Sequence, residues 1–243
     1  MYGNNDGSGI ASDSLLLSVA EQLKLPLLHI ARLAEVDAIE GRISAEDISR
    51  MQLSAEAALR LVDGYLLGLQ LAKEQTNLEL EPVSLGSTLV DTAHQLDGFA
   101  RLYGIDLEVH VAGRYVPVMA NAAGLKAAFA SLGYALIEAL PALQTTQTRV
   151  ALRLAAHRTP HGLVAGLYGR GDVGALSKDL KMAQQLCGGA RQPFTAVSST
   201  SGAGIFVADT IFRAMQSRLR AGKHQKLSGF AATLQPSRQL QLI

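Results

Sequence analysis

A proline and a histidine three residues apart stand in the middle of an apparent helix, residues 18–36, SVAEQLKLPLLHIARLAEV. Apolar residues recur there at steps of three and four, which is the pattern of an amphipathic helix. Pro26 costs such a helix about 3 kcal/mol relative to an ordinary residue. His29 carries an imidazole, which acts as a nucleophile near neutral pH. The pair raises the question of whether this helix is built around a reactive histidine.

Two glycine pairs offer a second kind of chemistry, the close approach of backbone to phosphate. Gly169 and Gly171 occur in LYGRGDVG, and Gly202 and Gly204 occur in SGAGIF. Glycine allows backbone N–H groups to approach an anion closely, but a single G-x-G is a weak signal on its own.

The remaining titratable pairs have simpler interpretations. Asp91 and His94 are three residues apart, as in ordinary helix-surface pairs. His157 and His161 flank Arg-Thr-Pro with no cysteine or acidic residue at ligand spacing. We therefore expect a solvated hairpin turn there and no metal site.

Composition excludes several classes of protein. Lys and Arg number 22 against 21 Asp and Glu, so the basic excess of a nucleic-acid-binding protein is missing. The one cysteine, Cys187, cannot form an intramolecular disulfide, which favours a reducing compartment. The first residues lack the charged and apolar regions of a signal peptide, and no apolar run reaches the ~18 residues of a membrane span. We expect a cytoplasmic protein with no membrane span.

Residues 12–76 are predicted to form an antiparallel two-helix hairpin after a flexible arm at 1–11. Ser44 begins the second helix, and Asp47 forms a weak capping box with it. The apolar stripe of the second helix is predicted at Ile48, Met51, Ala55, Ala58, Val62, Leu66 and Leu69. A lone hairpin cannot bury its whole apolar surface, so we expect a homodimer in which two hairpins form a four-helix bundle.

Residues 77–243 are predicted to fold as an α/β sandwich, which makes the whole chain α+β. Helices are expected at 84–104, 121–141, 174–187 and 205–222, with Pro141 ending the second of them and a loop at 188–204. Strands are expected within 77–86, 105–111, 113–120, 148–158, 162–170 and 226–237.

This order of elements resembles the core of sensor histidine kinases, in which a dimerisation and phosphotransfer hairpin precedes an ATPase domain of the GHKL (Bergerat) type. The resemblance spans about residues 12–240. It is carried by the helix–strand–strand–helix segment 83–139, by SGAGIFVADTIFRAM at 201–215, which is similar to the family's glycine-rich loop and helix, and by GFAATLQPS at 229–237.

The resemblance implies a role for the proline. In this family the phosphoacceptor histidine lies five residues before a Pro-Leu pair, and an acidic residue follows the histidine. Anchored on Pro26 and Leu27, the phosphoacceptor position is Glu21 and the acidic position is Gln22. His29 does not match the motif. It remains an alternative phosphoacceptor, whereas a polar residue on the helix flank is the simpler interpretation.

The resemblance also implies where ATP and Mg²⁺ would bind. The family's Asn-x-x-x-Asn helix, its Asp-x-Gly-x-Gly box and its glycine-rich loop fall on Ser131 and Ala135, on Gly169 and Gly171, and on Gly202 and Gly204. Ala135 has no oxygen for a hard cation. Gly169 has no carboxylate for the adenine amino group. We therefore expect no cofactor.

The resemblance as a whole implies a histidine-kinase-like protein of two-component signalling that has lost its chemistry and acts as a dimeric scaffold or regulator. Its partners would be a response regulator or an active histidine kinase. The alternatives are a kinase that binds ATP and Mg²⁺ in a divergent site, and a phosphotransferase that uses His29. A basic cluster near the last strand is either a solvated edge or a docking site for an acidic partner: Arg218, Arg220, Lys223, His224 and Lys226.

Overall fold

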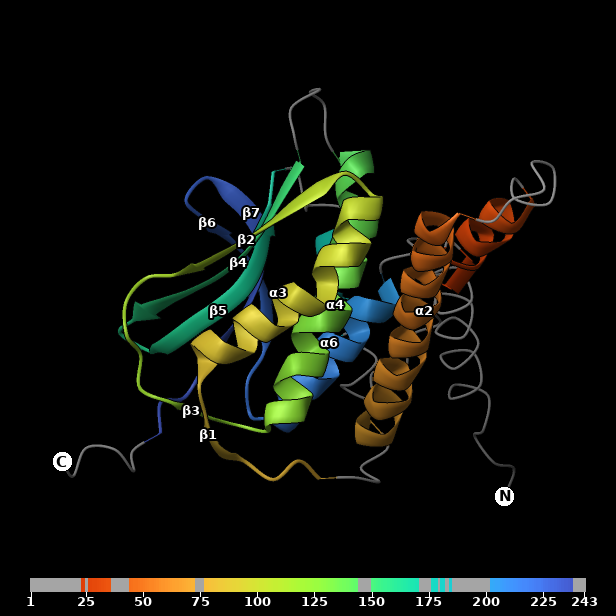
Figure 1. Ribbon diagram of the computed structural model, residues 1–243. Coiled ribbons are helices and arrows are strands. Elements are labelled where there is room, and N and C mark those ends of the chain that lie inside the picture. Colours follow the sequence, from red (N-terminus) through yellow and green to blue (C-terminus); the bar gives the residue numbers. More distant parts are fainter. Residues whose placement is uncertain are drawn as a thin grey trace, which may run out of the picture.

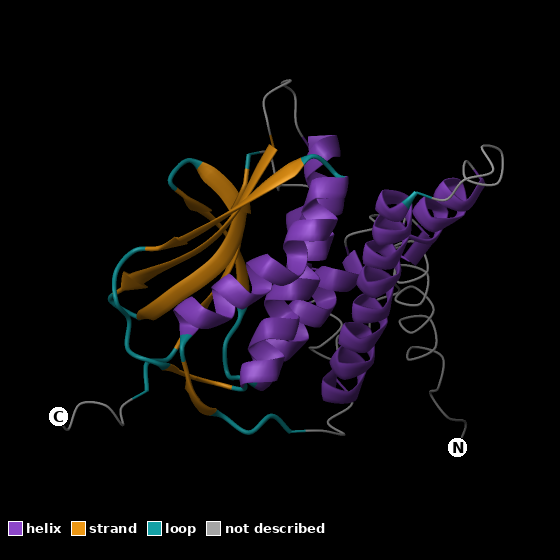
Figure 2. Ribbon diagram, in the orientation of Figure 1, coloured by secondary structure: helices purple, strands orange, loops and turns teal. Residues whose placement is uncertain are grey.

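The computed structural model describes residues 23–24, 26–35, 44–72, 77–143, 150–170, 176–178, 180–181, 184 and 202–237. These residues form three layers (Figures 1 and 2). A five-stranded sheet lies on one side, three helices cover one face of it, and a further helix packs on the far side of those helices.

Three of the described helices begin at a side chain that accepts from one of their first free N–H groups. Helix α2 (Ala45–Ala72) follows Ser44, whose Oγ accepts from the Asp47 amide at 3.0 Å and donates to the Asp47 carboxylate. Ser44 is therefore confirmed as the N-cap, but the Asp47 carboxylate bonds the serine hydroxyl instead of the Ser44 backbone N–H that a full capping box requires. Helix α3 (Leu85–Leu102) begins after Ser84. Helix α4 (Ala122–Leu143) begins after Asn121, whose Oδ1 accepts from the Gly124 amide at 2.8 Å. The last helix is α6 (Gly202–Ala214).

The strands form two sheets. A small antiparallel pair joins β1 (Glu81–Val83) to β3 (Val118–Ala120). The large sheet has the order β2-β4-β5-β7-β6 and is mixed, because β2 is parallel to β4 and the other pairs are antiparallel. Its strands are β2 (Ile105–Val111), β4 (Val150–Thr159), β5 (Gly162–Gly169), β6 (Leu219–His224) and β7 (Leu227–Leu234).

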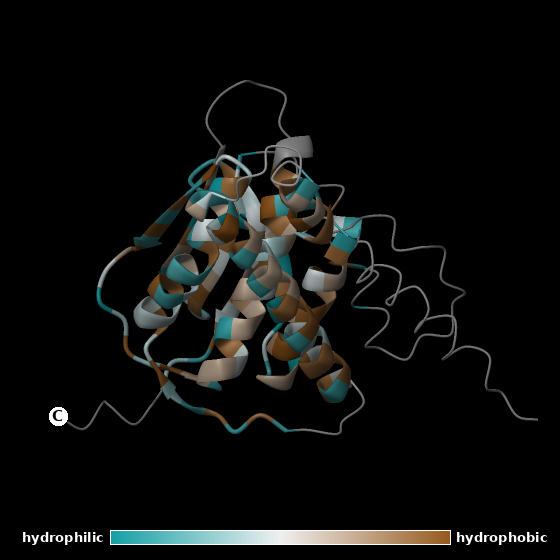
Figure 3. Ribbon diagram, turned by 45° about the vertical axis from the view of Figure 1, so that its right-hand side comes forward, coloured by the Kyte–Doolittle hydropathy of each residue, from teal (hydrophilic) through white to brown (hydrophobic). Residues whose placement is uncertain are grey.

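Helices α3, α4 and α6 share the inner face of this sheet, and the core lies between these layers. Phe129 of α4 and Phe212 of α6 meet edge to face with ring centroids 5.4 Å apart. In Figure 3 the helical ribbons carry hydrophobic and hydrophilic residues in alternation, as expected for helices with one buried face. The most apolar stretch is Ala122–Leu140, which is long and apolar enough to cross a membrane and is 72% buried inside the domain; this search covered the described part of the chain.

Two boundaries differ from the sequence prediction. Pro141 does not end α4, which continues to Leu143. The proline removes the one hydrogen bond that residue 141 would donate to the Ile137 carbonyl, and the helix extends only two residues beyond it. The helix predicted at 205–222 is also wrong in part, because α6 begins at Gly202 and ends at Ala214, and Leu219–His224 form strand β6. Arg220 therefore lies on an edge strand, and Arg218 lies directly before it.

Candidate functional site

Pro26 and His29 lie on a described helical segment, residues 26–35, which contacts α2. Pro26 is buried. Nδ1 of His29 lies 3.1 Å from Oγ of Ser54, a buried serine of α2. This hydrogen bond orients the imidazole through Nδ1, and Nε2 takes no part in it. Glu21 and Gln22 fall outside the described residues, so the motif position itself stays a prediction.

Ser131 and Ala135 lie one turn apart on α4, under helix α2. Ala135 is 0% exposed, and Ser131 is also buried. A Cβ built on Gly64 of α2 would lie 2.9 Å from Ser131 Oγ, and one on Gly68 would lie 3.2 Å from a methyl carbon of Val207 in α6. Glycines therefore let α2 approach α4 and α6 closely, and this approach covers the side of α4 that carries both positions.

Gly169 is the last residue of β5 and faces a leucine of α4. A Cβ on Gly169 would lie 2.6 Å from Cδ2 of Leu140, whose side chain is fully buried. The direction in which a carboxylate would extend from this position is therefore filled by the Leu140 side chain. Gly171 lies outside the described residues.

Gly202 and Gly204 are placed differently from the sequence prediction, which put them in a loop. Both are buried in the first turn of α6. Their backbone N–H groups are among the first of the helix, where intrahelical partners are missing, and both glycines are buried. The residues before Gly202 lie outside the described part of the chain.

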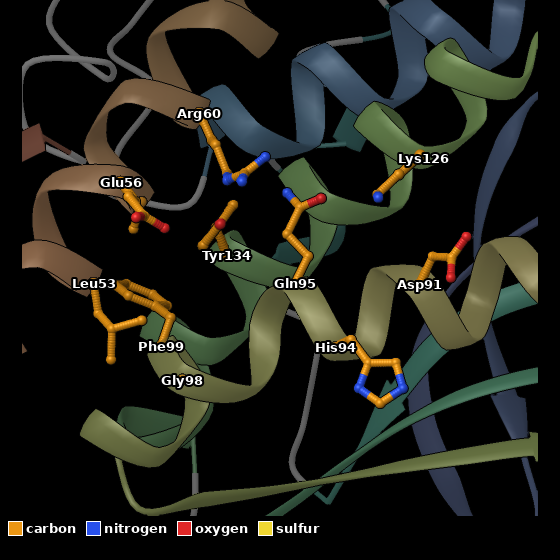
Figure 4. Close-up of a pocket in the computed structure, with 11 residues that line it drawn as sticks. Leu53, Glu56, Arg60, Asp91, His94, Gln95, Gly98, Phe99, Lys126 and Tyr134 are labelled. Atoms are coloured by element: carbon orange, nitrogen blue, oxygen red, sulfur yellow. The ribbon is translucent and has the colours of Figure 1, made fainter. Parts of the chain in front are cut away.

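A pocket of about 440 Å³ opens between α2, α3 and α4 (Figure 4). None of the family's nucleotide positions lines it. Charged and polar side chains from all three helices point into it, with a smaller apolar part: Leu53, Glu56, Ala57, Arg60, Asp91, His94, Gln95, Gly98, Phe99, Lys126 and Tyr134. The mixture of both charge signs suits a polar ligand or side chain better than an apolar one.

The hydroxyl of Tyr134 interacts with several polar and charged side chains of this pocket, and these interactions affect its pKa. Burial raises the pKa of Tyr134, and a hydrogen bond with Gln95 and the charge of Arg60 oppose that rise. The ring packs edge to face on Phe99 at 5.1 Å. Tyr134 is therefore a fixed, neutral hydrogen-bonding group at neutral pH. Within the described ranges, no group of three or more His, Cys, Asp or Glu is arranged to hold a metal ion.

Comparison with known proteins gives similarity of structure rather than of sequence. No family model matches the chain, and no curated protein matches it. The Acinetobacter baumannii histidine kinase AdeS superposes with a TM-score of 0.51 at 12% identity, over 88% of this chain and 96% of that one. Full-length ShkA, in a structure with AMPPNP, superposes with a TM-score of 0.53 at 17% identity, over 95% of this chain and 46% of that one.

The chain has a histidine-kinase-like fold. The expected resemblance is confirmed at that level, which includes the α+β class and the mixed sheet covered by helices. The chain spans about half the length of ShkA. At these identities the likeness concerns the fold, and function needs its own argument from the site.

Two features of this histidine-kinase-like domain escaped the sequence analysis. One is the pocket, to which Asp91 and His94 contribute although their spacing suggested a simple surface pair. The other is a buried carboxylate on α6. Asp209 is fully buried and pairs with Arg213 at 2.7 Å, while Gln184 approaches it at 3.5 Å and donates to the Leu219 carbonyl at 3.0 Å. The four-residue spacing of Asp209 and Arg213 was the available signal.

Proposed function

We propose that the chain is a catalytically degenerate, histidine-kinase-like protein of two-component signalling that acts as a dimeric scaffold or regulator. The histidine-kinase-like fold supports the signalling class. The loss of ATP chemistry is a proposal from the residues at the family's nucleotide positions.

The observation that carries this proposal is the filled space at those positions. Ala135 has no ligand oxygen and is fully buried beneath α2. Gly169 has no carboxylate, and Leu140 occupies the volume beside it. A nucleotide would need both the missing polar groups and a displacement of α2 and Leu140, so two independent costs oppose its binding.

Dimerisation is supported by the second apolar face of α2. Ala57, Leu61 and Tyr65 are buried against the sandwich, whereas Leu59 is 65% exposed. Ile48 and Leu66 are also exposed and lie on the same side of the helix as Leu59. This exposed face overlaps the predicted stripe at Ile48 and Leu66, and a second copy of the chain would cover it.

The proposed partners are a response regulator or an active histidine kinase of the same cytoplasmic pathway. An active kinase would pair through the exposed face of α2. An acidic response regulator would suit the exposed basic residues in and beside the edge strand β6: Arg218, Arg220, Lys223 and Lys226.

The test is calorimetric titration of the purified chain with ATP and ADP in the presence of Mg²⁺, together with an autophosphorylation assay using radiolabelled ATP. We expect no heat of binding at millimolar nucleotide and no incorporated label. Binding with Mg²⁺ would overturn the assignment of Ala135 and Gly169. Label that disappears in His29→Ala would instead establish a displaced phosphoacceptor, oriented by its hydrogen bond to Ser54.

A further inference from the structure

Three histidines from three different strands meet on the outer face of the sheet, the face away from the helices. His157 of β4 stacks on His224 of β6 with ring centroids 4.8 Å apart and an angle of 19° between the rings. His110 of β2 lies 5.9 Å from His224, and Tyr168 of β5 lies 5.2 Å from it. The sequence analysis expected His157 in a solvated turn, but it is half-buried within β4.

The β6–β7 hairpin must bend across the sheet for this meeting to occur, because β5 and β7 separate β6 from β4. Small residues on the outer face permit the bend. Ala155, Gly166 and Ala231 stand side by side in register on β4, β5 and β7. A Cβ on Gly166 would lie 2.3 Å from the Phe230 carbonyl oxygen, so no larger residue fits there. Gln225, in the turn, accepts from Arg153 of β4 at 2.7 Å.

Each of the three imidazoles has a buried ring nitrogen without a hydrogen-bond partner. These atoms are Nδ1 of His110, Nδ1 of His157 and Nε2 of His224. A neutral imidazole tolerates one such nitrogen as an unused acceptor. Protonation would convert it into a buried, charged N–H donor without an acceptor, which is far more costly.

The charged groups that face His224 do not offset that cost. From β2 it meets His110, and from β4 it meets His157 and Arg153, all of which are cations or potential cations. The carboxylate of Glu108 on β2 is bonded to Arg153 at 2.6 Å. Tyr168 of β5 is neutral at ordinary pH, since burial raises its pKa to about 12. Strand β7 contributes apolar contacts, and Lys223 and Lys226 flank His224 on its own hairpin.

We propose that His110, His157 and His224 form a pH-sensitive latch that holds the β6–β7 turn across the outer face of the sheet and releases it on acidification. Neutral rings stack and close the turn over β4 and β5. A positive charge on His224 lacks a hydrogen-bond acceptor and is repelled by Arg153, so the turn moves away and the basic edge strand changes position with it. This inference stands apart from the proposed function, because it concerns the opposite face of the sheet.

The pKa of His224 determines that the turn opens at low pH and not at high pH. Burial lowers this pKa below the ordinary 6.5, and the charges of His157, His110 and Arg153 lower it further. The unlatched turn exposes His224 and restores its ordinary pKa, so the open form binds more protons than the closed form below about pH 6.5. Closure is therefore complete above that pH and weakens as the pH falls towards the lowered pKa.

Hydrogen–deuterium exchange of the full chain, with chelator present, tests the latch at about pH 5.5 and about pH 7.5. Labelling times are scaled for the intrinsic pH dependence of amide exchange. We expect protection of peptides from residues 219–234 to fall several-fold in the wild type at the lower pH, because the open form then binds more protons than the closed form. In His224→Phe, which keeps an aromatic ring and removes the charge, protection should be equal at both pH values.

The matched control is His161→Gln, which removes an exposed histidine from the β4–β5 turn and should behave as the wild type. If His224→Phe does not fold, His157→Phe keeps a stacked ring, removes one of the charges that lower the pKa of His224 and leaves the hairpin unchanged, so it should reduce the pH dependence. Equal protection of the wild type at both pH values, or an undiminished pH dependence in the folded phenylalanine variant, would overturn the latch.

Discussion

Gly64 of α2 lies directly against Ser131 of α4, so that a Cβ on the glycine would stand 2.9 Å from the serine Oγ. The close approach lets α2 form a layer on the helices of the sandwich instead of standing apart from them. A larger residue would force the two helices apart and disturb the packing of α2 on Val207 as well.

Replacing Gly64 with leucine should therefore lower the free energy of unfolding by about 1–3 kcal/mol, the usual cost of overpacking. Urea denaturation followed by circular dichroism measures the change. Gly222→Ala is the control, because no atom lies within 4 Å of the added Cβ, and it should not lower stability. A Gly64→Leu variant as stable as the wild type would show that α2 does not depend on this contact.

A double-mutant cycle between Gly169 and Leu140 tests whether the leucine fills the space beside the glycine. Gly169→Ala should cost about 1–3 kcal/mol by overpacking, and Leu140→Ala about 2–5 kcal/mol by leaving a cavity. The double variant should lose at least about 1 kcal/mol less than the sum, because the shortened side chain makes room for the added methyl group. Additive losses would contradict the packing described at this position.

Asp209→Ala should destabilise the domain by about 3 kcal/mol, since it leaves Arg213 without its partner and Gln184 without one of its contacts. Chemical denaturation measures this loss. Asp97→Ala is the matched control: it removes the same kind of four-residue pair, with Arg101, at an exposed site, and should cost less than about 0.5 kcal/mol. Similar losses in the free energy of unfolding for the two variants would mean that burial does not strengthen the contribution of Asp209 to stability.

Ultraviolet titration of the tyrosines should show at least two late ionisations, those of Tyr103 and Tyr168. Burial raises the pKa of Tyr103 and of Tyr168 from 10.0 to about 12, and the charge of Glu138 adds to the effect at Tyr103. The folded chain then binds more protons than the unfolded chain above pH 10.0, so the free energy of unfolding should fall as pH rises from 10.0 towards 12. Tyr103→Phe should remove one late ionisation, and a titration in which all tyrosines ionise together near pH 10.0 would contradict the burial of both rings.

Leu59→Glu should convert the proposed dimer to a monomer, because it places a charge in the middle of the exposed face of α2. Sedimentation or light scattering measures the mass in solution. Val116→Glu changes a residue that is also exposed, outside α2, and should leave the mass unchanged. A wild-type chain that is monomeric at all accessible concentrations would refute the dimer directly.

Much of the sandwich was predictable because residues that begin or end helices in the sequence pattern do so in the structure. Gly104, the residue at which the first of the predicted sandwich helices ends, adopts φ +68° just after α3, and the Oγ of Ser44 caps α2 by accepting from the Asp47 amide. Strand β6 was missed because its alternating charged and small residues, LRAGKH, lack the apolar alternation of a strand with one buried face. An edge strand needs no such pattern, and its pairing partner β7 supplies the hydrogen bonds.

The candidate site was predictable only by analogy. The resemblance located Ser131, Ala135 and Gly169, but nothing in the sequence indicated that Gly64 and Leu140 would occupy the neighbouring space. The pocket and the histidine cluster were missed for one physical reason. The pocket joins residues of α2, α3 and α4, and the histidine cluster joins residues of β2, β4 and β6. Hydrophobic periodicity predicts single helices and strands, but it does not predict contacts between residues far apart in the chain.

The parallel pairing of β2 with β4 also sets an order of assembly during synthesis. Strand β2 is made before α4 and β4, and as an edge strand it has no other neighbour in the five-stranded sheet. It must stay unpaired until the chain has passed through α4, whereas β4–β5 and β6–β7 close locally as hairpins. Helix α3 directly precedes β2 and contacts it. Because α3 is synthesised before β2, it is available to cover one face of β2 on the nascent chain before β4 pairs with that strand.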